Sequence, residues 1–334
     1  MKHANIPVFI PHLGCPNGCV FCNQRTITGA EFDEGSVVDI IENALSTLSG
    51  REAEIAFFGG SFTAIDRELM IRLLKTGKSY VDKGRVISLR CSTRPDAVSE
   101  EILDILEEYG VRTVELGIQS TDDAVLTASE RGHSAACAID AMERVSKRGF
   151  ELIGQMMVAL PASGSEAEVR TAGDICRFAK AARVYPTVIF KDTVLCRMAK
   201  EGRYIQPTPE EMVKRTALVL AEFARHGVPV IRTGLQYGAE LSPERDSVVG
   251  EYDCAVGEKA MSLIYLERLR EELSGADEDH PAVLVPRGEI SKAVGQKKAN
   301  KTALINEFGF KNIKFIESEL PVYTVKLIRS KQCT

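Results

Sequence analysis

The sequence predicts an α/β protein built around a parallel sheet, and two observations lead to this class. Short apolar runs alternate with longer stretches of helical periodicity about six times between residues 1 and 233. Glycine, proline or polar residues separate these segments. The alternation implies parallel strands joined by helical crossovers. Two architectures fit it: an open doubly wound sheet, and a barrel of the eight-fold type, complete or partial.

The predicted strands are apolar runs that stop at turn residues. They cover residues 6–13, 54–58, 86–91, 113–119, 151–160, 184–190 and 228–232. The predicted helices carry apolar residues at helical spacing, and two of them begin at favourable first residues, Ser99 and Pro209. They cover residues 37–48, 67–81, 99–109, 134–148, 166–181 and 209–226.

A shift in composition predicts three segments along the chain. Residues 1–233 form the core, residues 234–257 a loop-rich connector, and residues 258–334 a small basic α/β module. The net charge of −5 hides an asymmetry, because residues 285–334 contain ten Lys and Arg against four Asp and Glu. A basic module on an acidic body favours an anionic partner such as nucleic acid. A solvated lysine-rich surface explains the same charges equally well.

The sequence also bears on where the protein works. No apolar run approaches the length of a membrane-spanning helix, so we expect no membrane partner. The N-terminal residues lack the apolar core of a signal peptide. Nine cysteines, an odd number in a chain of 334 residues, argue against a disulfide framework. These features favour the reducing cytoplasm.

Three of the cysteines lie close together, directly after the first predicted strand. Cys15, Cys19 and Cys22 have C-x3-C-x2-C spacing. Thiolates hold iron–sulfur clusters, and three cysteines leave one iron of a four-iron cluster open for a substrate or cofactor. The alternative is a structural zinc site with His12 as the fourth ligand, in a non-enzymatic RNA-binding protein.

Polar and glycine residues gather at the ends of the predicted strands, where parallel α/β folds bind their ligands. Glycine permits close backbone approach, hydroxyl and amide groups bond a ribose, and arginine presents a planar fork to a carboxylate. The candidates are Gly59, Gly60 and Ser61 after the second strand, Ser92, Thr93 and Arg94 after the third, Gln119 after the fourth, and Gln155 and Met156 in the fifth.

The cysteine spacing resembles that of the radical S-adenosylmethionine (SAM) superfamily. Within that superfamily, the sequence resembles the radical core of the Elongator catalytic subunit. This resemblance covers roughly residues 5–230. It implies a partial barrel of six β/α units. That subunit spaces its cysteines differently and carries an acetyltransferase domain, so acetyl transfer is not implied for this chain. The similar segments are residues 93–96, 114–120, 131–133, 184–188 and 202–204.

The resemblance also implies a cofactor site. The three cysteines hold a [4Fe–4S] cluster whose open iron chelates SAM, and an electron from the cluster yields a 5′-deoxyadenosyl radical that abstracts hydrogen from a substrate. Phe21 lies near the adenine, and Gly59 and Gly60 present backbone groups to the methionine amino group. Ser61 stands where the family commonly has an acid. The other strand-end candidates complete the SAM site.

Two partners are expected from the same resemblance. One is an RNA substrate, with tRNA as the first choice, because the Elongator family modifies wobble uridine. The other is an electron donor of flavodoxin or ferredoxin type. A small molecule or a peptide is the alternative substrate. The aromatic content of 6% and the acidic overall charge weigh against extensive base stacking.

Overall fold

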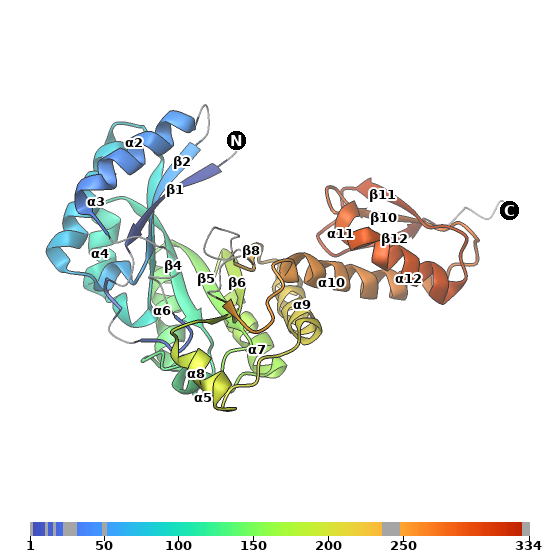
Figure 1. Cartoon of the computed structure of the whole chain (residues 1–334). Helices are drawn as coiled ribbons and strands as arrows, with labels where there is room; N and C mark the ends of the chain where they lie inside the picture. Colours follow the sequence, from blue (N-terminus) through green and yellow to red (C-terminus); the bar gives the residue numbers. More distant parts are fainter. Residues whose placement is uncertain are drawn as a thin grey trace. The chain divides into compact units, whose positions relative to one another are not determined.

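Seven parallel strands form the sheet that carries the predicted site (Figure 1). The computed structural model describes residues 3–10, 13–15, 18–22, 32–48, 52–235 and 248–328. The strands pair in the order β1-β2-β3-β4-β5-β6-β8, and all six ladders are parallel. Their bounds are β1 His3–Ile10, β2 Glu52–Gly59, β3 Ser88–Thr93, β4 Val111–Gln119, β5 Glu151–Val158, β6 Ala181–Pro186 and β8 Val230–Thr233.

Helices pack on one face of this sheet. Gly77 of α3 lies against Leu89 and Phe57, and Ile175 of α7 lies against Gly154. The sheet curves away from its helices, and the partial barrel expected from the sequence is confirmed (Figure 1). The helices are α2 Val37–Thr47, α3 Arg67–Asp82, α4 Glu100–Glu108, α5 Asp123–Ala128, α6 Ala135–Lys147, α7 Ser165–Cys176 and α8 Val194–Lys200.

The region around β6 differs from the sequence prediction. The helix expected over residues 166–181 ends at Cys176, and the strand expected over residues 184–190 begins earlier, at Ala181. Alanine favours helices, but pairing with β5 holds Ala181 in the sheet. The second part of the expected strand is a separate element, β7 (Ile189–Phe190), which pairs antiparallel with β9 (Val248–Val249). The short helices α5 and α8 were also not predicted.

The chain forms two compact units. One contains residues 1–206 and 228–252, and the other contains residues 207–227 and 253–334. In the second unit, apolar side chains of α10 pack against a three-stranded sheet in the order β11-β10-β12. No described helix is both long enough and apolar enough to cross a bilayer. The elements are α9 Pro209–Arg225, α10 Val256–Leu273, β10 Ala282–Pro286, α11 Ile290–Val294, α12 Ala299–Phe308, β11 Lys314–Ser318 and β12 Lys326–Ile328.

The concave face of the large sheet carries a buried ion network. Arg90 of β3 lies 2.7 Å from a Glu54 oxygen and 2.9 Å from Glu115 Oε1. Arg183 of β6 lies 2.9 Å from Glu115 Oε2, and the Gln155 amide donates to the same oxygen at 2.7 Å. Glu115 is only 1% exposed, so these three partners replace its water shell.

Replacing Glu115 with alanine should lower the free energy of unfolding by about 3 kcal/mol, because the buried guanidinium groups of Arg90 and Arg183 lose their shared partner. Urea unfolding measures this loss. Arg67→Ala is the control, since it breaks an ion pair with Glu101 in which both side chains are exposed. We expect a much smaller change there, and equal losses in the two variants would contradict the role given to burial.

Candidate active site

The first cysteine lies in a segment packed against the turn after β2. The Ser61 N–H donates to the Leu13 carbonyl at 3.3 Å. Gly14 has a φ of +72°, and a Cβ at this position would overlap the Ser61 carbonyl and lie 2.6 Å from the Ile65 nitrogen. Only glycine permits this approach. The contact fixes the position of Cys15, the next residue.

The other two cysteines lie in a turn that is anchored through Val20. This side chain is buried in an apolar cluster with Leu195. The Val20 N–H donates to the Ser129 carbonyl at 3.2 Å, and its carbonyl accepts from the Leu195 N–H at 2.7 Å. The Cys22 N–H closes the turn on the Cys19 carbonyl at 3.0 Å. The cysteine segment is therefore held at two places by different parts of the barrel.

The glycine turn after β2 uses its backbone donors within the chain. The Gly60 N–H donates to the Ile10 carbonyl at 2.9 Å. The hydroxyls of Ser61 and Thr63 both bond the Thr93 hydroxyl, at 2.8 and 2.6 Å. Ser61 and Thr93 are almost completely buried. These two predicted ligand residues join the ends of β2 and β3 and support the cysteine segment.

Two buried arginines lie beside the cysteine turn. The fork of Arg94 is bound by Asp96 at 2.9 and 2.8 Å, and its Nη2 also donates to the Arg131 carbonyl at 2.6 Å. Arg131 Nη1 lies 3.2 Å from the Cys19 sulfur, and its Nη2 donates to the Gly117 carbonyl. Arg131 therefore connects the cysteine turn to β4.

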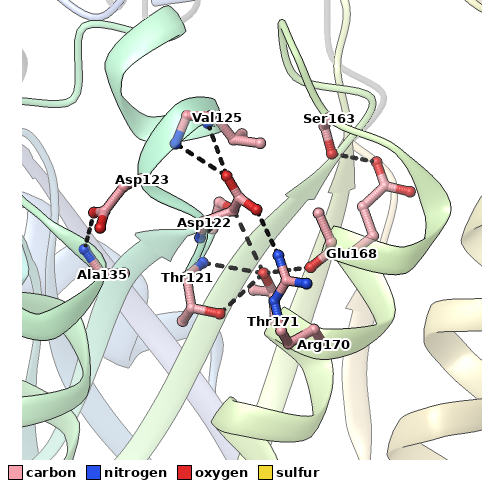
Figure 2. Close-up of polar contacts among 12 residues, drawn as sticks. Thr121, Asp122, Asp123, Val125, Ala135, Ser163, Glu168, Arg170 and Thr171 are labelled. Atoms are coloured by element: carbon pink, nitrogen blue, oxygen red, sulfur yellow. Dashed lines mark hydrogen bonds and ion pairs between the residues drawn. The ribbon is translucent and has the colours of Figure 1, made fainter.

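The end of β4 is an irregular turn at Gln119. This residue has a φ of +66°, and the register with β5 shifts just before it. Residues of α7 hold the turn, as Figure 2 shows: the Thr121 N–H donates to the Thr171 hydroxyl at 3.0 Å, and Arg170 pairs with Asp122. The position of Gln119 thus depends on α7.

The end of β5 is held by the same helix. The Glu168 carboxylate accepts the Ser163 hydroxyl at 3.0 Å, as Figure 2 shows, and it also accepts the Ala159 N–H at 2.6 Å. Ala159 itself has a φ of +65°, and its carbonyl accepts from the Tyr204 hydroxyl at 2.8 Å. Helix α7 therefore positions two neighbouring strand ends.

The remaining predicted ligands do not all lie on one face. Ser92 and Gln155 alternate with buried neighbours and lie on the concave face, where Gln155 bonds Glu115. Met156 is fully buried on the opposite, helix-covered face. Phe21 packs against the apolar cluster around Val20.

Three buried polar atoms near the cysteines have no hydrogen-bond partner among the described residues. They are Arg94 Nη1, Arg131 Nε and Gln119 Oε1. A Cβ placed on Gly117 would lie 3.1 Å from Gln119 Nε2 and 3.5 Å from Arg131 Nη2, so these two side chains meet at Gly117. An unbonded buried polar atom is costly. Two donors and one acceptor fit a ligand that carries a carboxylate and hydroxyl groups, as SAM does.

A [4Fe–4S] cluster requires a different arrangement of the three cysteines from a single metal ion. Within the described ranges, no three His, Cys, Asp or Glu side chains gather around a point that a single metal ion would occupy. In a [4Fe–4S] cluster each thiolate binds its own iron, so convergence on one point is not required. Burial and the Cys19 thiol raise the pKa of Cys15, and the cations Arg94 and Arg131 oppose this rise. The alternative ligand His12 lies outside the described residues.

Arg131 and His133 are absent from the predicted ligands, although both belong to the segment 131–133 that resembles the Elongator core. Arg131 contacts Cys19, as described above. Burial and the charge of Arg131 lower the pKa of His133 to about 4. Its ring is therefore neutral near pH 7. In the sequence, only the similarity of residues 131–133 to the Elongator core pointed to Arg131 and His133.

Two family models match the chain. Residues 9–169 match the Radical SAM superfamily, and residues 179–266 match the Radical_SAM C-terminal domain. The first match includes the cysteine segment and the carboxyl ends of β1 to β5.

Individual relatives match part of the chain. The uncharacterized protein MJ0486 of Methanocaldococcus jannaschii is 29% identical over 218 residues, or 61% of this chain and 66% of that protein. Human Elongator complex protein 3 is 26% identical over 193 residues, or 51% of this chain and 35% of that protein. The solved structure of Elp3 from Methanocaldococcus infernus, with an N-terminal deletion, has a TM-score of 0.60 at 20% identity. It shares the fold over 80% of this chain and 65% of its own.

Gly14→Ala should remove most of the iron and sulfide that the protein binds after anaerobic reconstitution, because the added Cβ overlaps the turn after β2 and displaces Cys15. Gly18→Ala is the matched control in the same segment, since a Cβ there meets no atom of the described residues within 4 Å. Circular dichroism confirms that both variants fold. Equal iron content in the two variants would contradict the role of the Gly14 contact.

Proposed function

Because the chain belongs to the radical SAM superfamily, we propose that Cys15, Cys19 and Cys22 bind a [4Fe–4S] cluster with one iron left open for SAM. As a member of this superfamily, the protein is a radical SAM enzyme. One observation carries the placement of the site: the cysteine segment lies among buried polar atoms of Arg94, Arg131 and Gln119 that lack partners in the described chain. The proposed SAM site lies there.

The chain's own residues bind and orient the cofactor in this proposal. Arg94 offers its unbonded Nη1 to the carboxylate of SAM, and Gln119 offers its amide oxygen to a ribose hydroxyl. Phe21 provides an apolar surface for the adenine. Gly59 and Gly60, whose turn packs closely against the backbone of Ile10 and Leu13, present backbone groups to the methionine amino group. Ser92 and Gln155 face the concave side, toward the substrate.

A cluster held by Cys15, Cys19 and Cys22 would supply the electron for the reductive cleavage of SAM, and this chemistry would lead to hydrogen abstraction from the substrate. The electron must come from a partner, and we propose a donor of the flavodoxin or ferredoxin type. A reducing cytoplasm suits both the donor and an oxygen-sensitive cluster.

Anaerobically reconstituted protein, reduced with dithionite in the presence of SAM, should release 5′-deoxyadenosine. Cys19→Ala should lose the cluster and this product, with the fold largely kept, because Val20 and its backbone bonds still anchor the turn. Ser79→Ala, which removes a half-buried hydroxyl that donates to the Thr76 carbonyl of the same helix α3, is the control and should keep both. Wild-type protein that binds zinc, stays colourless and releases no 5′-deoxyadenosine would overturn the proposal in favour of a zinc-stabilised protein.

We further propose that the substrate is RNA, with tRNA as the first choice. The support is the likeness to the Elongator radical core and the basic stretch of residues 285–334 in the second unit, with ten Lys and Arg against four Asp and Glu. Several lysines there are neutralised by a carboxylate, as Lys259 is by Asp253 and Lys311 by Asp279. The alternative substrate is a small molecule or a peptide. An RNA-binding experiment distinguishes this alternative from an RNA substrate.

Three other lysines of the second unit are not neutralised. Lys297, Lys298 and Lys301 form no ion pair with any residue in the described ranges. Lys297 and Lys298 also have positive φ values of 50° and 64°, which a lysine adopts only at an energetic cost. Uncompensated cations attract phosphate groups, so this loop is the proposed contact for the RNA backbone.

The triple variant Lys297→Gln, Lys298→Gln, Lys301→Gln should bind tRNA about tenfold more weakly, and the salt dependence of its affinity should be shallower by about one unit of slope for each lost phosphate contact. Fluorescence anisotropy over a range of salt concentrations measures both. The matched control replaces the paired lysines Lys259, Lys292 and Lys311 with Gln. Equal tRNA affinity in both triple variants and the wild type would count against an RNA contact at this loop.

A further inference from the structure

Arg131 places a positive charge against the sulfur of Cys19. Its Nη1 lies 3.2 Å from that sulfur, and both residues are more than nine-tenths buried, at 6% and 8% exposure. The two residues are far apart in the sequence, so the contact is created by the fold. A thiolate is a much stronger acceptor for this N–H than a neutral thiol.

The guanidinium group is fixed from several sides. Its Nη2 donates to the Gly117 carbonyl of β4, and the Arg131 N–H donates to the Leu126 carbonyl at 3.0 Å. The Arg131 carbonyl accepts from Arg94, whose fork is in turn bound by Asp96. The distance between the charge and the sulfur is therefore set by the barrel and not by a free side chain.

Arg131 differs from the other buried arginines in its partners. Arg90 and Arg183 pair with glutamates, and Arg94 pairs with Asp96. Arg131 bonds a sulfur and a carbonyl and forms no ion pair with a carboxylate in the part of the chain that the structure describes. A buried guanidinium without a counter-charge is costly. A thiolate at Cys19 supplies that counter-charge.

We infer that Arg131 hydrogen-bonds a thiolate ligand of the cluster and raises the cluster's reduction potential. The inference rests on the proposed function. Reduction adds one negative charge, and a fixed cation in a buried site stabilises the reduced form more than the oxidised form. Charge, burial and hydrogen bonds to sulfur are the means by which a protein sets this potential. Arg131 is thus a positioning residue that acts through Cys19.

The test is a potentiometric titration of the full-length, reconstituted protein without SAM, followed by the electron paramagnetic resonance signal of the reduced cluster. Arg131→Met and Arg131→Gln remove the charge, and Arg131→Lys keeps it. Arg144→Met is the control, because Arg144 also donates to a carbonyl, that of Val98 at 2.9 Å, but forms no hydrogen bond with Cys15, Cys19 or Cys22 in the described part of the chain.

At the wild-type midpoint potential, the ratio of reduced to oxidised cluster in Arg131→Met should be at least tenfold lower. A tenfold change corresponds to a midpoint potential lowered by about 59 mV for a one-electron couple. Arg131→Gln should shift in the same direction, Arg131→Lys should restore most of the wild-type value, and Arg144→Met should not shift. A structural role alone would change the amount of cluster and leave its midpoint unchanged.

A full complement of cluster with an unchanged midpoint in Arg131→Met overturns the inference. If that variant assembles no cluster, Arg131→Gln decides in its place, and an unchanged midpoint there overturns the inference in the same way. A wild-type protein that binds no cluster overturns the proposed function and this inference with it. A wild-type cluster with unshifted variants overturns the inference alone.

Discussion

The backbone contact between Gly14 and the turn after β2 is the constraint on which the candidate site depends. It places Cys15 at the carboxyl end of the sheet, one residue from a position where no side chain fits. Cys19 and Cys22 are held separately, through Val20 and its bonds to Ser129 and Leu195. The three sulfurs thus take their places from elements far apart in the chain. Their arrangement is a property of the folded barrel more than of the local spacing.

The two faces of the sheet have different chemistry, and this difference shapes what the barrel can do. The helix-covered face is apolar, as Leu89 and Phe57 illustrate. The concave face carries charged side chains whose partners are also buried. Such a network is seldom a source of stability, because desolvation offsets the attraction. It does fix side chains in one arrangement beside the site, which is what a reactive intermediate requires of its surroundings.

The sequence was sufficient for the fold class, and it also indicates where the proposed site lies. Glycine and polar turns separate the strands from β1 to β5, so their apolar runs are distinct, and the cysteine spacing marks the site directly. The region from residue 176 to 190 was predicted less well, because helix end, strand and β7 follow each other without a break in composition. Pairing with β5 and β9 decides those bounds, and no local pattern reports it.

The chemical roles of single residues were harder to predict than their positions. Gly59 and Gly60 were expected to present backbone groups to the cofactor, and the structure shows that the Gly60 N–H bonds the Ile10 carbonyl. Met156 was expected beside its neighbour Gln155 and lies on the other face, because strand residues alternate. Arg131 was overlooked since its partner is more than a hundred residues away. Each case depends on a tertiary contact that a one-dimensional pattern does not contain.

The division of the chain has a consequence for how the protein forms during synthesis. Helix α9 belongs to the second unit, but β8, which completes the large sheet, follows it in the sequence. The first unit can therefore close while α9 still lacks its partner, since α10 leaves the ribosome later. Until then the side of α9 that contacts α10 is uncovered. A nascent chain of this protein thus passes through a stage in which a chaperone has a defined segment to bind.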